Sequence, residues 1–196
     1  DHPDYEAVKA IEEETLQCKR IIEGLLDLSR PTSGTGEIVD VEELIDEVLA
    51  GADMQNRTEG IRVHKHIRTP PVKLDVGRAR LKQVAVNMLN NAFDAARDAD
   101  EPQVTIRGRV ARRVTGTNGH DGTLVLEFED NGPGMDEKTR EHLFEPFFTT
   151  KSAGTGLGLA VTYSILRTCD GHIAVDSEPG RGTRFIVKLP TARRSA

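Results

Sequence analysis

RARLKQVAVNMLNNAFDAARDA, the sequence of residues 78–99, predicts a long helix with two apolar rows and a polar row between them. One apolar row is Leu81, Val84, Met88, Ala92, Ala95 and Ala99, and the other is Val86, Leu89, Phe93 and Ala96. The polar row is Arg80, Gln83, Asn87, Asn91 and Asp94. Since apolar rows flank it on both sides, we expect the polar row to lie at the edge of a core, not in bulk water.

Two asparagines of the polar row need an explanation, because asparagine is a poor residue in the middle of a helix. Asn87 and Asn91 are four positions apart and therefore share one face. In one interpretation they line a polar ligand or coordinate a hard cation through their carbonyl oxygens. In the other they are amides at the edge of the core that bond to nearby backbone. The helix alone does not separate the two.

The segments around this helix alternate between strand and helix patterns. Strands are predicted at 37–40, 61–67, 72–75, 103–113, 123–130, 172–177 and 183–189, and helices at 41–50 and 156–168. Residues 131–155 are expected to form a long loop that holds one short helical piece. Consecutive strands joined by hairpins indicate a mixed, mainly antiparallel sheet with helices on one face. This is an α+β fold, without the regular βαβ order of a doubly wound nucleotide fold.

Two glycine-rich segments stand where a ligand can approach the backbone. Asp130-Asn-Gly-Pro-Gly-Met135 follows a predicted strand, and its carboxylate can accept from an exocyclic amine, although a simple tight turn is the alternative. Gly154-Thr-Gly-Leu-Gly-Leu159 opens a predicted helix whose exposed N–H groups and dipole favour an anion, with Lys151 just before it. Neither segment is a dinucleotide fingerprint or a P-loop. Between them, the apolar residues 143–148 are interpreted as a loop anchor, a lid, or both.

The N-terminal segment and the composition limit the remaining possibilities. Residues 5–30 have helical apolar spacing and are expected to pair with another chain in a bundle, or else to fold back on the main domain. The 196 residues carry a net charge of −6, and no basic stripe with aromatics appears, so nucleic acid is not an expected partner. No segment predicts a membrane span. Two distant cysteines fit a reducing cytosol, so we expect a cytoplasmic location, and the chain, which begins without Met, is interpreted as part of a longer protein.

Taken in order, these motifs resemble the ATP-binding catalytic domain of sensor histidine kinases, a family grouped with the gyrase, MutL and heat-shock chaperone ATPases. The matching boxes are Asn87–Ala92, Asp130–Gly134, Phe144–Phe148 and Gly154–Leu159, followed by a matching tail at 176–185. The phrases at 91–96 and 146–151 are most similar to the nitrogen-regulation and dicarboxylate-sensing branch. The resemblance implies a two-layer α/β sandwich of the Bergerat type over 37–190, with a partial dimerisation and phosphoacceptor helix at 1–31, a linker at 32–36 and a tail at 191–196.

The resemblance also implies roles at the site. Asn91 would bind Mg²⁺ that bridges the ATP phosphates, with Asn87 supporting phosphate or metal nearby. Asp130 would accept from the adenine amine, helped by Thr183. Lys151 would reach the outer phosphate. The remaining nucleotide-binding positions would be those that admit the adenine and lid, Gly132 and Gly134, and those whose amides hold the phosphates, Gly154, Gly156, Leu157 and Gly158.

One position favours a kinase over a hydrolase. In the hydrolytic relatives, the residue four positions before the metal-binding asparagine is a glutamate that can activate water. Here it is Asn87, an amide that does not titrate, so ATP would wait for a protein nucleophile. The rival functions are a related ATPase or an anti-sigma type Ser/Thr kinase, and a nucleotide-binding module without chemistry.

The sequence departs from the family pattern at two points. Asp94 stands where the family often has a lysine or arginine, so Lys151 or Arg97 would have to supply that charge. No histidine lies in a phosphoacceptor box, since His120-Asp121 falls in a predicted turn. We therefore expect the acceptor helix outside this chain, no autophosphorylation by the fragment, a homodimer through residues 5–30 and a response-regulator receiver domain as partner. The whole protein could be anchored in a membrane that this fragment does not contact.

Overall fold

The computed structural model describes residues 36–112, 122–151 and 154–191. The helices are α2 (Val41–Met54), α3 (Arg78–Ala96), α4 (Glu137–His142) and α5 (Gly158–Arg167). The strands are β1 (Glu37–Val39), β2 (Arg62–Arg68), β3 (Val72–Leu74), β4 (Gln103–Arg112), β5 (Gly122–Asp130), β6 (His172–Ser177) and β7 (Thr183–Thr191). The predicted N-terminal helix, most of the linker and the turn around His120 lie outside the described residues. Within the described ranges, every helix is too short or too polar to cross a membrane.

The seven strands form one mixed sheet, which confirms the predicted fold class. Its order is β1-β3-β7-β5-β4-β2, with β6 paired to the other side of β7. β2 runs parallel to β4, and every other pair is antiparallel. The register sets Asp130 at the end of β5 directly opposite Thr183 at the start of β7. Two residues distant in the sequence are thus brought together at one end of the sheet.

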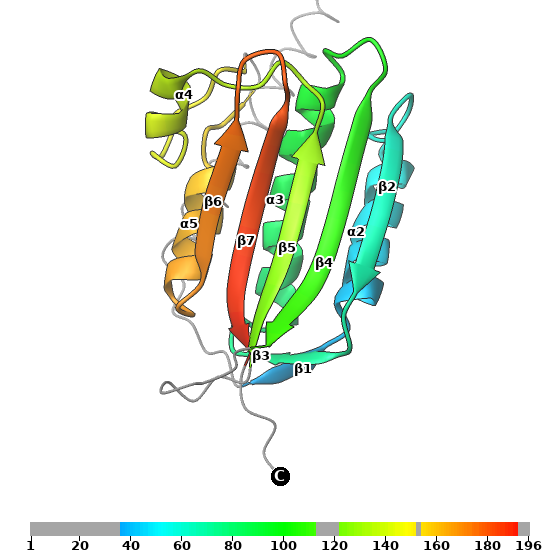
Figure 1. Ribbon diagram of the computed structural model, residues 1–196, viewed down its shortest axis with the longest axis vertical. Helices are drawn as coiled ribbons and strands as arrows, with labels where there is room; N and C mark the ends of the chain where they lie inside the picture. Colours follow the sequence, from blue (N-terminus) through cyan, green and yellow to red (C-terminus); the bar gives the residue numbers. More distant parts are fainter. Residues whose placement is uncertain (1–35, 113–121, 152–153, 192–196) are drawn as a thin grey trace, which may run out of the picture.

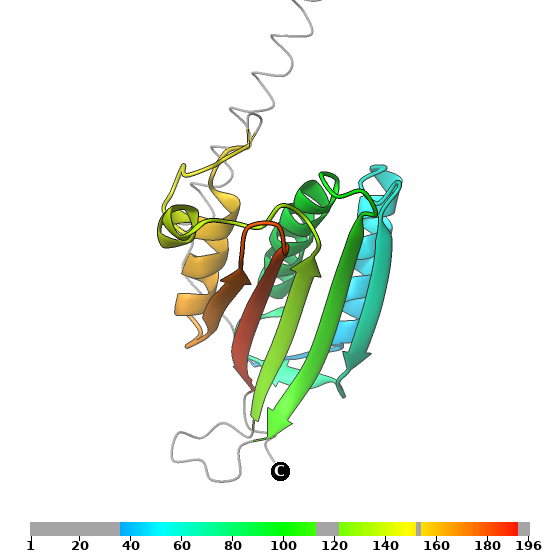
Figure 2. The same ribbon diagram turned by 45° about the horizontal axis from the view of Figure 1, so that its top comes forward.

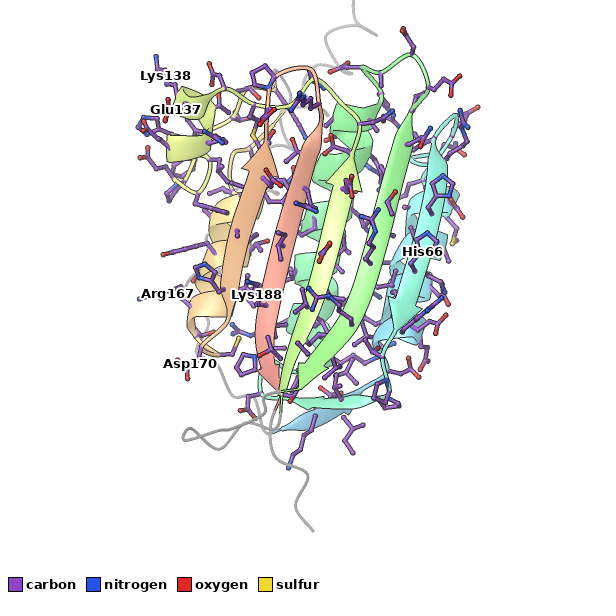
Figure 3. The ribbon with its side chains drawn as sticks, viewed as in Figure 1. His66, Glu137, Lys138, Arg167, Asp170 and Lys188 are labelled. Atoms are coloured by element: carbon purple, nitrogen blue, oxygen red, sulfur yellow. The ribbon has the colours of Figure 1, made fainter. Side chains whose placement is uncertain are left out.

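Within the described residues, the helices that pack on this sheet cover one of its faces. Figures 1 and 2 show α2, α3 and α5 side by side behind the strands. The largest fully buried side chains join the two layers, and they include Met88 and Phe93 on α3 and Leu126 and Phe128 on β5. The other face of the sheet carries polar side chains such as His66 and Lys188, both exposed (Figure 3). The result is the predicted two-layer sandwich.

The polar row of α3 lies at the edge of this core, as predicted. Asn87, Asn91 and Asp94 are all half-buried, beside fully buried Met88 and Ala92. The predicted apolar rows were wrong for three residues. Ala85 is buried although neither row includes it, whereas Val86 and Ala95, which the rows include, are only half-buried. The buried stripe is therefore narrower than the two sequence rows together.

Two predicted helix ends were wrong, each for a local reason. α2 continues through Gly51 to Met54, because Ala52 is buried and extends the packed stripe by one turn. α3 ends at Ala96 instead of Ala99. There the N–H groups of Asp98 and Ala99 donate three residues back, to Ala95 and Ala96, so the last turn tightens and leaves the α-helix.

The start of α2 depends on one carboxylate. The Asp40 side chain accepts from the backbone N–H groups of Glu42 and Glu43 at 3.0 and 3.1 Å. Asp40→Ala removes both bonds and should lower the free energy of unfolding by about 1 kcal/mol. Asp40→Asn keeps an acceptor oxygen and should lose much less. Urea unfolding followed by circular dichroism measures both, and an alanine variant as stable as the wild type would contradict this role.

Candidate nucleotide-binding site

Asp130 is a buried carboxylate at the end of β5. Its side chain is 5% exposed, and one oxygen accepts from the backbone N–H of Gly132 at 3.0 Å. Burial disfavours the charged form and raises the pKa of Asp130 from 3.8 to about 6, against the opposing effect of backbone hydrogen bonds from Gly132 and Thr183. A carboxylate held in this way is a strong acceptor with little competition from water.

Two buried hydroxyl groups, those of Ser177 and Thr183, lie beside Asp130 at this end of the sheet. Ser177 Oγ donates to the carbonyl of Gly182 at 3.0 Å and accepts from the backbone N–H of Met135 at 2.9 Å. The Thr183 hydroxyl lies 3.0 Å from Ser177 Oγ, and since the serine proton is already used, Thr183 is the donor. Ser177 links the β6–β7 turn to the first glycine segment, and the sequence analysis did not single it out.

The first glycine segment approaches its neighbours too closely for larger residues. A Cβ at Gly132 would overlap the carbonyl of Ala95 on α3. Gly134 has φ +69°, and a Cβ there would overlap the carbonyl of Glu178. The segment is therefore pressed between the end of α3 and the β6–β7 turn. This compact wall keeps Asp130 out of water.

The second glycine segment leads into α5. Leu157 occupies the N-cap position without making a side-chain cap bond, so the helix start offers backbone N–H groups. The carbonyl of Gly156 accepts from the N–H of Phe147 at 3.0 Å, and the N–H of Gly154 donates to the carbonyl of Lys151 at 3.2 Å. These bonds hold Phe147 against Gly156 and Lys151 against Gly154, just before α5. An anion is favoured at such a helix start.

Asn87 joins α3 to α5. Its amide nitrogen donates to the carbonyl of Gly158 at 3.0 Å and to the hydroxyl of Thr162 at 3.3 Å. For Asn87 the interpretation as an amide that bonds to nearby backbone at the edge of the core is confirmed, and the amide also borders the second glycine segment. The bond fixes the distance between the amide stripe of α3 and the start of α5.

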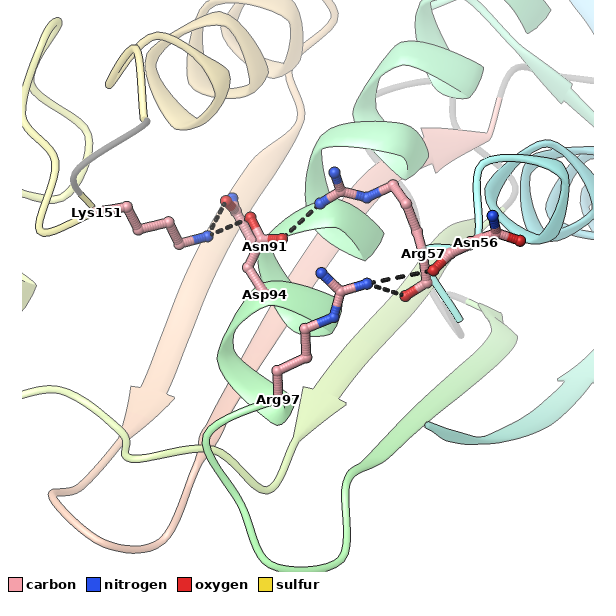
Figure 4. A network of polar contacts seen from close by, with 6 residues as sticks. All are labelled: Asn56, Arg57, Asn91, Asp94, Arg97 and Lys151. Atoms are coloured by element: carbon pink, nitrogen blue, oxygen red, sulfur yellow. Dashed lines mark hydrogen bonds and ion pairs between the residues drawn. The ribbon is translucent and has the colours of Figure 1, made fainter. Parts of the chain in front are cut away.

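Lys151 lies against the end of the amide stripe (Figure 4). Its ammonium group donates to Asn91 Oδ1 at 3.4 Å and to Asp94 Oδ2 at 2.9 Å. The other oxygen of Asp94 accepts from the guanidinium of Arg57 at 2.5 Å. Two cations were expected to supply the positive charge that Asp94 does not. Of these, Lys151 contacts Asp94, whereas Arg97 donates to the backbone carbonyls of Asn56 and Arg57. The sequence analysis missed Arg57, which follows α2 in a segment without periodicity.

The apolar segment 143–148 is divided in its role. Leu143 is buried, and the rings of Phe144 and Tyr163 lie 5.4 Å apart, so this part anchors the segment on α5. Phe147, in contrast, is exposed and has φ +68°. The anchor interpretation therefore holds for the beginning of the segment, and Phe147 keeps an apolar surface open at its end.

The sequence-predicted residues come together at one end of the sandwich. Asp130 and Thr183 lie at paired strand ends, Asn87 and Asn91 on α3, and Lys151 beside Asn91. Amide oxygens are hard donors of the kind Mg²⁺ accepts alongside phosphates and water. Among the residues that the structure describes, no group of three or more His, Cys, Asp or Glu side chains could hold a metal ion. Asn91 Oδ1 is an amide oxygen of this kind, and in this structure it accepts from Lys151.

Comparison with known proteins places this geometry in a family. Residues 77–193 match the family of histidine kinase-, DNA gyrase B-, and HSP90-like ATPases. The signal transduction histidine-protein kinase AtoS of Escherichia coli (strain K12) is 33% identical over 192 residues, which are 96% of this chain and 29% of AtoS. The chain spans less than a third of the length of the first curated relatives it matches.

Solved structures agree. The catalytic domain of the histidine kinase ThkA is 26% identical with a TM-score of 0.65, over 81% of this chain and 97% of that domain. ThkA in complex with the response regulator protein TrrA is 23% identical, with a TM-score of 0.74 over 98% of this chain and 53% of that one. Full-length ShkA in complex with AMPPNP is 22% identical, with a TM-score of 0.75 over 100% of this chain and 40% of ShkA. The chain therefore belongs to the family of histidine kinase-, DNA gyrase B- and HSP90-like ATPases, and its ATP-binding catalytic domain is of the sensor histidine kinase type.

Proposed function

We propose that the chain is the catalytic part of a sensor histidine kinase that transfers the γ-phosphoryl group of ATP to a histidine. The bond between the γ-phosphorus and the ADP oxygen breaks, and a bond to an imidazole nitrogen forms. An aspartate on a response-regulator receiver domain then takes the phosphoryl group. ThkA, which has the same fold, is known in complex with a response regulator, and this supports the choice of partner.

The observation that carries the proposal is the state of Asn87. Its amide nitrogen is committed to Gly158 and Thr162, and an amide has no titrating proton with which to activate water. The position thus holds the site together without supplying a general base. Phosphoryl transfer is catalysed mainly by positioning and charge, which an amide can serve.

The other residues have roles that follow from their surroundings. Asp130 accepts from the adenine amine, with Thr183 beside it, and Gly132 and Gly134 let the base lie close to the backbone. The phosphates lie toward the start of α5, where the amides of Gly154, Gly156, Leu157 and Gly158 surround them. Asn91 would hold Mg²⁺, which would neutralise phosphate charge, and Lys151 would reach the outer phosphate.

The proposal also divides the chain into the parts of a kinase. Residues 1–31 belong to the dimerisation and phosphoacceptor domain, 32–36 to a linker, 37–190 to the catalytic domain and 191–196 to a tail. The kinase is a homodimer through residues 5–30, and it belongs to the nitrogen-regulation and dicarboxylate-sensing branch. The relatives' designations as sensor and signal transduction kinases support this organisation.

The reaction is tested with γ-labelled ATP, Mg²⁺, this chain and a fragment of the parent protein that carries its phosphoacceptor histidine. We expect protein-bound label that survives base and is lost in acid, because phosphohistidine has that stability. Release of free phosphate without labelled protein would instead indicate an ATPase. Nucleotide binding with neither product would indicate a binding module.

Asp130→Asn tests the adenine site. Since a hydrogen bond to a charged group contributes about 1.5–3 kcal/mol, ATP affinity should fall about 10- to 100-fold by calorimetry. Glu127→Gln is the matched control, because this acid on the same strand is half-buried, points to the opposite face of the sheet and pairs with Arg109. The control should bind ATP like the wild type. Equal affinities for all three proteins would remove Asp130 from the site.

The raised pKa of Asp130 predicts opposite pH effects on stability and on binding. Folding destabilises the ionised carboxylate, so its stabilising contribution is complete below pH 3.8 and is lost as the pH rises through about 6. Relative to Asp130→Asn, the wild type should therefore lose about 2 kcal/mol of unfolding free energy between pH 4 and pH 7. Denaturant unfolding of both proteins across this range measures the difference, and a constant difference contradicts the raised pKa.

Binding should follow the ionised form. Adenosine affinity of the wild type should fall as the pH drops through about 6, because a protonated Asp130 accepts poorly from the adenine amine. Adenosine is the probe because it carries no titrating phosphate. Asp130→Asn should show no such step, so the comparison isolates this carboxyl.

A further inference from the structure

We propose that Asp94 is a positioning residue of the phosphate site, which holds Lys151 and Arg57 as a pair of cations beside Asn91. The inference rests on the proposed function, since it concerns the phosphate end of the same site. It assigns a role to an acidic residue where the charge of the ligand would favour a basic one. Arg57 enters as a second cation of the site.

The geometry of Asp94 supports a bridging role. Each carboxylate oxygen has its own cationic partner, Lys151 on one and Arg57 on the other (Figure 4). The three side chains are 30–40% exposed, so the cluster lies at the edge of the core, with Lys151 on its solvent side. Charge-assisted hydrogen bonds in such surroundings are directional and hold long side chains in one arrangement. Lys151 is thereby held within 3.4 Å of Asn91 Oδ1.

Arg57 is fixed from the opposite side. Its backbone N–H donates to the carbonyl of Ala52, and its own carbonyl accepts from Arg97 at 3.0 Å. Arg97 also donates to the carbonyl of Asn56, so the end of α3 holds the segment after α2 in place. Arg57 Nε is buried and has no acceptor within the described part of the chain. Asp94 is thus the side-chain partner of this guanidinium, through Arg57 Nη2.

The charges of the three groups decide what the cluster offers to an anion. One carboxylate with two cations has a net charge of +1, so the cluster attracts phosphate although α3 itself contributes an acid. If Asp94 acted only through its own charge, removing that charge would tighten ATP binding. If Asp94 positions the two cations, removing it should weaken ATP binding. The two effects have opposite signs.

The experiment is calorimetry of the whole chain with MgATP and, separately, with adenosine. Asp94→Asn should bind MgATP about tenfold more weakly, because the amide has one acceptor oxygen and no charge, so it cannot hold both Lys151 and Arg57. Adenosine affinity should stay unchanged, which shows that the fold and the adenine end are intact. Asp98→Asn is the matched control, an exposed acid four residues further along the chain, and should change neither affinity.

A second background separates positioning from general destabilisation. The Arg57→Met, Lys151→Met double variant lacks both cations and should bind MgATP weakly. In this background Asp94→Asn should increase the affinity for MgATP, because the substitution removes only the negative charge that repels the phosphates. Equal or tighter MgATP binding by Asp94→Asn in the wild-type background overturns the inference, as does a decrease that persists in the double variant. A wild-type chain that binds neither MgATP nor adenosine overturns the proposed function itself.

Discussion

The burial of the Asp130 carboxylate is the constraint on which the rest of the site depends. A charged group stays out of water only if the surrounding backbone supplies donors, and here Gly132 and Thr183 supply them. Gly132 can do so because it lies against α3 without a side chain. Thr183 can do so because the β5–β7 register sets it opposite Asp130. Gly132, the pairing of β5 with β7 and the packing against α3 thus all contribute to keeping this one carboxylate buried.

α3 has two duties that its sequence keeps apart. Its apolar rows bind it to the sheet, and its polar row faces the second glycine segment and Lys151. Asn87 belongs to the polar row and also holds α3 to α5, because its amide bonds to Gly158 and Thr162. A change in this row therefore alters the distance between α3 and α5 as well as the chemistry of the site. Asp94 in this row is negative, but together with Lys151 and Arg57 it forms a cluster with a net positive charge.

The sequence predicted the features that depend on local pattern. The strand ending at Asp130, the amide stripe of α3 and the glycine opening of α5 follow from periodicity and backbone chemistry, and the resemblance added their order. Arg57 and Ser177 escaped prediction because their roles arise from tertiary placement. Arg57 lies in an aperiodic segment after α2, and Ser177 acts only once β6 and β7 pair. The ends of α2 and α3 were misplaced because packing of Ala52 and three-residue hydrogen bonds override propensity.

The site joins residues that are far apart in the sequence, and this links ligand binding to folding of the domain. Asn87 and Gly158 are 71 residues apart, and Asp130 meets Thr183 only when the last strand has joined the sheet. The site is therefore complete only in the whole folded domain, and a ligand that needs the whole site binds that fold alone. Nucleotide at 100 times its dissociation constant would add about 2.7 kcal/mol to the stability of that fold. The cellular nucleotide pool would then act as a folding ligand for this domain, besides serving as its substrate.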